Sequence, residues 1–162
     1  MKTYSASEVA KYLRALTNPE DGDLLSNLKL QKLCYYAQGI GIATRGVPLF
    51  SDEIEAWQHG PVVPSVYQEY KEHGANDIPP PVGLDSSIFT KADINLMNDV
   101  YDEYGQFSAW KLRNMTHQEP PWVNAYKNTH SKIITPEALA EHFIPEVNDS
   151  YRDAYRAKIQ EQ

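Results

Sequence analysis

The side chains that could carry out chemistry are scattered along this chain rather than grouped. No Gly-x-Ser-x-Gly segment would place a serine on a nucleophile elbow. No two histidines are four residues apart, the spacing that puts two zinc ligands on one face of a helix. The histidines are His59, His73, His117, His130 and His142. We therefore expect surface or hydrogen-bonded histidines, with no catalytic group, no metal site and no bound cofactor.

Glu53 and Glu55 are two carboxylates on one short segment beside Trp57. Paired carboxylates can act as general acid and base. Residues two apart on a strand face the same side, but nothing nearby in the sequence would shift the pKa of one of them. We favour an exposed acidic edge, which beside Trp57 is a reasonable docking feature. The single cysteine, Cys34, falls on an apolar helix stripe, where it is expected to pack as a small hydrophobic residue.

Helical periodicity and capping signals run through most of the sequence. Ser5 and Glu8 form a capping-box pattern before the first helix. The second helix is predicted from Ser26 to about Thr44, with one apolar stripe, and Gly46 supplies its stop. The stripe consists of Leu30, Leu33, Cys34, Ala37, Ile40 and Gly41. Further helices are predicted over 64–74, 90–105, 108–119 and 135–143, with one more turn at 122–126.

Between the second and third predicted helices the helical period fades, over residues 49–58. An imperfect alternation there indicates an extended strand or a β-hairpin, which His59-Gly60-Pro61 should break. The fold class predicted is therefore mainly α: a compact, single-domain helical bundle with a short extended or β-hairpin segment around 49–58. Trp110 and Trp122 are expected in the core.

The bulk composition suits one folded domain that binds another protein. The chain has 162 residues, 41% of them hydrophobic, and a net charge of −7. That charge argues against a broad phosphate-binding surface and fits a partner with a basic surface. No stretch resembles a signal peptide or is long enough to cross a bilayer, so we expect a cytoplasmic protein without nucleic-acid or membrane partners.

Several separated motifs occur along the chain in a fixed order: LQKLCYYAQG (30–39), GVPLF (46–50), EIEAWQHGPVVPSVY (53–67), SAWKL (108–112) and THQEPPW (116–122). Their order and spacing resemble the Panacea (SocA-like) antitoxin family, also described as a phage-associated domain. The resemblance covers roughly residues 5–144. We accordingly expect an antitoxin domain over 1–144 and a C-terminal helical extension over 145–162, which either docks on the core or lies at an interface.

The resemblance implies a mainly helical antitoxin, encoded beside a toxin gene, that neutralises the cognate toxin by direct protein–protein binding. At least one relative instead acts as a proteolytic adaptor that delivers its toxin to a cytoplasmic protease, and this remains the alternative. The family implies no cofactor and no enzymatic activity.

The part of the toxin-facing surface that we predict is the segment where the family motif and the local chemistry meet. It combines an acidic edge, Trp57, a tight Gly-Pro turn and the exposed start of a helix, whose unpaired N–H groups could receive a partner's acceptor. The residues are Glu53, Glu55, Trp57, His59, Gly60, Pro61, Val62 and Tyr67. The alternative is that Trp57 and the turn are framework, holding the second helix against the third.

Overall fold

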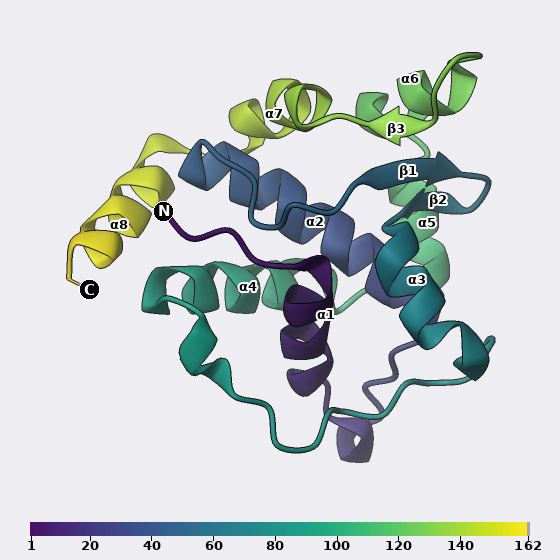
Figure 1. Ribbon diagram of the computed structural model, residues 1–162, viewed down its shortest axis with the longest axis horizontal. Helices are drawn as coiled ribbons and strands as arrows, with labels where there is room; N and C mark the ends of the chain where they lie inside the picture. The colour runs from purple at the N-terminus through teal and green to yellow at the C-terminus, as the bar shows by residue number, and fades with distance from the viewer. Residues whose placement is uncertain (162) are drawn as a thin grey trace.

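The computed structural model describes residues 1–161, which form eight α-helices and one small sheet (Figure 1). The helices are α1 (Ala6–Ala15), α2 (Asn27–Arg45), α3 (Pro64–Tyr70), α4 (Lys91–Tyr104), α5 (Ala109–Thr116), α6 (Pro120–Lys127), α7 (Pro136–Phe143) and α8 (Asp149–Gln160). The short 3-10 helices are η1 (Pro19–Asp21), η2 (Lys71–His73), η3 (Ser86–Ile88) and η4 (Ile144–Glu146). The mainly α prediction is confirmed. No helix in this part of the chain is long and apolar enough to span a membrane.

Helix α2 runs through the middle of the molecule, with α7 and α4 on either side and the hairpin near its N-terminal half (Figure 1). The Ser26 hydroxyl caps it by accepting from the Lys29 N–H, and Gly46 ends it at a φ of 81°. Every residue of α2 except Leu28 and Ile40 is buried. The predicted stripe is buried apart from the half-buried Ile40, but the other faces of the helix are buried as well, because neighbours surround it on all sides.

Small residues let these neighbours approach α2 closely. A Cβ atom added at Gly39 would lie 2.3 Å from the ring of Phe143 on α7. One added at Gly41 would lie 3.1 Å from Leu49. Glycine at these two positions therefore lets α7 and the segment after α2 lie directly against the helix.

The predicted extended segment is a β-hairpin that lies later in the chain than expected. Strand β1 (Ile54–Trp57) pairs antiparallel with β2 (Gly60–Val62) and with β3 (Ile133–Ile134), giving the order β2-β1-β3. The extended segment breaks where expected, because β1 ends at Trp57 and the chain turns at Gln58-His59, but Gly60 and Pro61 belong to the second strand and not to the break. Strand β3 was not predicted, since two residues carry no periodicity.

The local helix signals otherwise correspond to real helix ends. Ser5 and Glu8 form the capping box of α1, and Thr90, Ser108 and Thr135 each cap the helix that follows. Helix α5 ends at Thr116, earlier than the residue 119 expected, and Pro120 begins α6, which is longer than the single turn expected.

The two tryptophans expected in the core differ. Trp122 is buried, as expected, but Trp110 is 55% exposed. Helix α5 buries only Leu112 and Thr116, so Trp110 lies on its outer face.

The C-terminal helix α8 docks on α4 and on α2. Tyr155 is buried, and its hydroxyl donates to Asp93 Oδ1 at 2.6 Å. The same buried carboxylate accepts from the Tyr4 hydroxyl at 2.7 Å and lies 3.4 Å from Arg45 Nε. Asp93 therefore joins the N-terminal segment, α2, α4 and α8.

Candidate functional site

Side chains of α2 hold the second strand of the hairpin through hydrogen bonds to its backbone. The Lys32 ammonium donates to the Pro61 carbonyl at 3.1 Å, and the Gln31 side-chain oxygen accepts from the Val63 N–H at 2.9 Å. Gly60 has a φ of 108°, and a Cβ there would lie 2.6 Å from Lys32 Cε. Gly60 and Pro61 are buried and fix the position of the turn.

Trp57 is held from three directions while part of its ring remains accessible. Its indole N–H donates to Glu55 Oε1 at 2.9 Å, and its ring lies edge-on to Tyr67 with centroids 5.0 Å apart. Its carbonyl accepts from the Trp122 indole N–H at 2.8 Å. The Glu55 carboxylate therefore fixes the orientation of Trp57. Glu53 is exposed and lines a different depression, beside Ile133 and Pro136.

A groove of about 410 Å³ lies between the hairpin, α3 and the start of α2. Four of the predicted residues line it: Trp57, His59, Val62 and Tyr67. Lys71 lines it as well. The structure thus brings these four residues together, places Gly60 and Pro61 under them as framework, and leaves Glu53 outside.

Helix α5 extends this surface with two residues that the sequence prediction did not include. The Arg113 guanidinium lies 4.4 Å from the centre of the Trp110 ring, a cation–π contact. Its Nε donates to His59 Nδ1 at 3.3 Å. The available signal was the spacing of Trp110 and Arg113, three residues apart and so on one face of a helix.

Positive charge is concentrated around the turn. Burial, followed by the charge of Arg113, lowers the pKa of Lys32 to about 7. The pKa of His117, which stacks on Trp122 at 3.9 Å, is lowered by burial and then by Arg113, with smaller contributions from Lys32 and His59. The cations therefore repel one another where the hairpin meets α5.

A partly buried acid lies on the other side of α2, and the sequence prediction missed it. Glu119 accepts from the Tyr35 and Tyr36 hydroxyls, both at 2.8 Å. Burial raises the pKa of Glu119, and the two hydroxyls partly offset that rise. Tyr36 also stacks on Tyr104, with ring centres 3.9 Å apart. Because every group in this cluster has a partner, we interpret it as structural.

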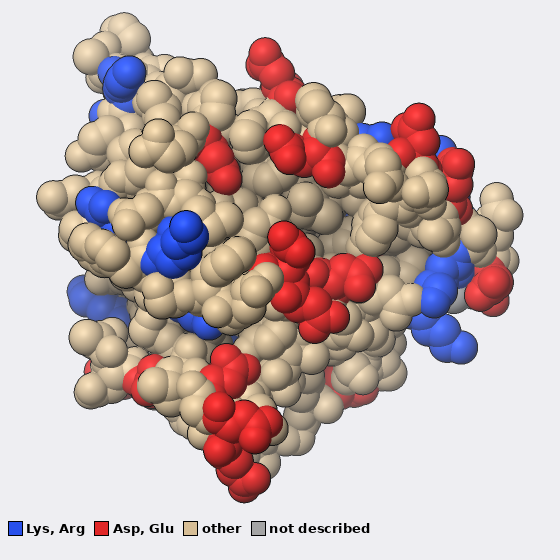
Figure 2. Space-filling model, turned by 180° about the vertical axis from the view of Figure 1, so that it is seen from behind, with Lys and Arg blue, Asp and Glu red and all other residues tan. Residues whose placement is uncertain are grey.

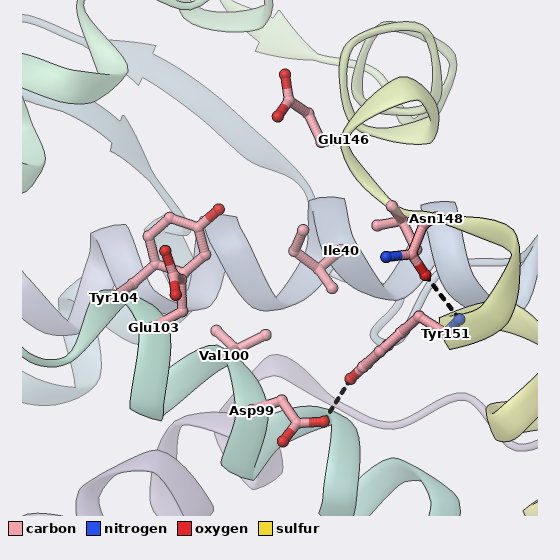
Figure 3. A pocket seen from close by; sticks show the side chains of 9 residues that line it. Ile40, Asp99, Val100, Glu103, Tyr104, Glu146, Asn148 and Tyr151 are labelled. Carbon is pink, nitrogen blue, oxygen red and sulfur yellow. Dashed lines mark hydrogen bonds between the residues drawn. The ribbon is translucent and has the colours of Figure 1, made fainter.

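A second cavity, of about 300 Å³, lies between α2, α4, η4 and the start of α8 (Figure 3). Its carboxylates are Asp99, Glu103 and Glu146, and the Tyr151 hydroxyl donates to Asp99 at 2.7 Å. Burial and then the charges of Glu119, Glu103 and Glu146 raise the pKa of Tyr104 in its wall to about 12. On the face opposite to the one seen in Figure 1, Asp and Glu side chains gather around a hollow, with most Lys and Arg nearer the edges (Figure 2).

The remaining candidates for chemistry are separate from these surfaces. Cys34 is fully buried, and burial raises its thiol pKa to about 12, as expected for a packing residue. No group of three or more His, Cys, Asp or Glu side chains in residues 1–161 is arranged to hold a metal ion.

Comparison with known proteins relates this surface to a family. Over 50 residues, 31% of this chain, the sequence is 46% identical to antitoxin SocA of Caulobacter vibrioides (strain NA1000 / CB15N). The aligned stretch spans 27% of that protein. No solved structure matches the chain. Residues 30–123, which run from α2 to α6, match the family described as antitoxin SocA-like, Panacea domain. The chain belongs to the antitoxin SocA-like, Panacea domain family.

Proposed function

We propose that this protein is an antitoxin that neutralises a cognate toxin by direct protein–protein binding in the cytoplasm. The observation that carries the proposal is the family match over residues 30–123. That stretch includes most of α2, both strands of the hairpin and α5. It therefore contains the four predicted residues that line the groove, together with Trp110 and Arg113.

The character of the surface supports binding rather than catalysis. Trp57 and Tyr67 are fixed in place by Glu55 and by each other, so little side-chain freedom is lost when a partner covers them. Tryptophan, tyrosine and arginine are the residues most often found at the energetic centre of protein interfaces. We propose that Trp57, His59, Val62 and Tyr67 contact the toxin directly, and that Gly60 and Pro61 act by holding the turn.

The test is co-expression of this chain with the product of the adjacent gene, followed by growth measurement and co-purification. The proposal expects the neighbour alone to stop growth, and co-expression to restore growth with a stable complex of both proteins. A catalytically silent antitoxin acts in proportion to its amount, so rescue should fail once the toxin is in molar excess.

Two results would count against direct neutralisation. A neighbour that is harmless on its own leaves no toxin to neutralise. Rescue without a complex, with the toxin disappearing unless a protease gene is deleted, would instead indicate an adaptor that delivers the toxin for degradation.

A further inference from the structure

The hairpin, α3, η2 and α5 together present an exposed surface of aromatic and cationic side chains, which we call the aromatic–cationic face. Its members are Trp57, His59, Tyr67, Lys71, Trp110 and Arg113. His59 joins its two halves, because it lines the groove and also lies 6.0 Å from the Trp110 ring, centre to centre. The face is therefore continuous from the groove to α5.

Trp110 is the largest apolar side chain on this face that is left open to solvent, with 55% of its surface exposed. Within residues 1–161 its ring neighbours are His59 and Arg113, which cover one side of it. An exposed tryptophan next to an apolar groove is typical of a surface that another protein covers.

The charge of the face is opposite to that of the whole chain. The protein carries a net charge of −7, yet no Asp or Glu lines the groove, and Lys71 does. The ion pairs of residues 1–161 join Arg45 to Asp93, Glu119 to His142, and two arginines of α8 to aspartates, so neither Lys71 nor Arg113 has a carboxylate partner there. The Glu55 carboxylate, which accepts from the Trp57 indole N–H, keeps its charge and borders the face, so the two cations of the face adjoin one anion.

Arg113 also has donor capacity that the fold does not use. Its Nε donates to His59 and its Nη1 to Asn114, while no hydrogen bond from its Nη2 is present in residues 1–161. The ring beneath it fixes the plane of the guanidinium. A carboxylate could therefore bind this side chain without displacing its present partners.

We propose that the aromatic–cationic face binds an acidic segment of the toxin, in which a carboxylate pairs with Arg113 or Lys71 and an adjacent apolar side chain enters the groove against Trp57 and Tyr67. This proposal rests on the proposed function and adds the chemistry of the partner. It reverses the expectation drawn from net charge alone, that the partner would present a basic surface. Local charge decides which surfaces meet, because salt screens charges more than about 10 Å away.

The test measures the dissociation constant of the purified toxin for the full chain and its variants by calorimetry, at two salt concentrations. We expect Arg113→Glu and Trp110→Ala each to weaken binding by about tenfold or more. The matched control is Arg156→Glu, which changes the net charge equally on the exposed side of α8 and should leave the constant within about twofold. Wild-type binding should weaken as salt is raised.

Folding is checked by thermal unfolding of each variant. Lys71→Glu, on the exposed η2 helix, provides the charge test if Arg113→Glu is unstable. A charge-swap experiment completes the test. Acidic residues of the toxin are replaced one at a time by lysine, and one of these toxin variants should bind the Arg113→Glu variant as the original pair does.

Three results would overturn the inference. Unchanged binding by the face variants, with the wild type still bound, would refute it and leave the proposed function standing. Loss of binding in Glu103→Lys instead would place a basic toxin segment in the acidic cavity. A wild-type chain that does not bind the toxin would refute both.

Discussion

At the residue scale, Gly60 joins the hairpin to the helix beneath it. A residue with a side chain there would adopt an unfavourable φ of 108° and press on Lys32 Cε and Thr116 Oγ1. We expect Gly60→Ala to lower the free energy of unfolding by roughly 2–4 kcal/mol, from backbone strain and close contact together. Denaturant titration measures this.

Gly46 is the matched control for that substitution. It has a φ of 81°, but a Cβ there would meet no atom within 4 Å. Gly46→Ala should therefore cost only the backbone term, about 1 kcal/mol. Equal losses in the two variants would show that the contact with Lys32 does not matter.

Lys32 is a second residue whose burial should affect a measurable property, the dependence of the stability on pH. Its pKa is about 7 in the fold because of burial and Arg113, and about 10.4 in an unfolded chain. Between these values the unfolded state binds more protons, so the contribution of Lys32 to the stability should rise with pH from about 7 to about 10. Below pH 7 both states are protonated and the contribution stays at its lowest value.

Lys32→Met removes that titration. We therefore expect the free energy of unfolding of the wild type, relative to that of the variant, to increase as pH rises from 7 to 9. Buried tyrosines and Cys34 are present in both proteins and cancel in the difference. Lys71→Met, at an exposed lysine, controls for the loss of one charge. The same pH slope in wild type and Lys32→Met would contradict the assignment.

At the element scale, Glu119 connects the start of α6 to α2. Glu119→Ala would leave the Tyr35 and Tyr36 hydroxyls without their acceptor, at about 1–3 kcal/mol for each buried group. We expect a loss of roughly 2–5 kcal/mol in chemical unfolding. Glu119→Gln keeps one carbonyl oxygen and should lose less. If the glutamine variant is as unstable as the alanine variant, the charge matters more than the hydrogen bonds.

The secondary-structure elements differ in how far they could be predicted from the sequence. Helix ends were predictable because their signals are local: Ser5 with Glu8, Thr90, Ser108 and the Thr135-Pro136 pair each act within one turn. The hairpin was only half predicted, because Gly60-Pro61 reads as a break until Gln31 and Lys32 are seen to hold the second strand in place.

Residues whose roles depend on distant neighbours could not be predicted in this way. Trp110 follows the helical pattern of a core residue, and only the packing of α5 through Leu112 leaves it exposed. Of the predicted surface residues, Trp57, His59, Val62 and Tyr67 do line one groove, since they lie on two adjacent elements. Arg113 was missed because it reaches His59 across 54 positions of sequence.

At the scale of the whole molecule, charge is divided between two surfaces. Carboxylates line the cavity between α4 and η4, while Lys71 and Arg113, which have no carboxylate partner in residues 1–161, lie beside the hairpin and α5. A chain with a net charge of −7 can thus present a cationic contact surface. This separation also keeps the acidic cavity from neutralising Arg113 within the same molecule.

The C-terminal extension provides the last prediction, which concerns the proposed boundary after residue 144. Helix α8 contributes the buried Tyr155 hydroxyl to Asp93, and Arg152 Nε donates to the Ala43 carbonyl at 2.9 Å. A chain ending at residue 144 should therefore stay helical but unfold at a temperature lower by roughly 5–15 °C, since each kcal/mol lost is worth about 2–8 °C in domains of this size range. Because the aromatic–cationic face lies outside the deleted residues, binding to the toxin should persist below that temperature.

Tyr155→Phe is the control for this truncation, because it removes one hydrogen bond, at about 1 kcal/mol, while keeping the helix. Circular dichroism with calorimetry decides the matter: a fragment with no cooperative unfolding would show that residues 145–162 belong to the domain rather than extend it.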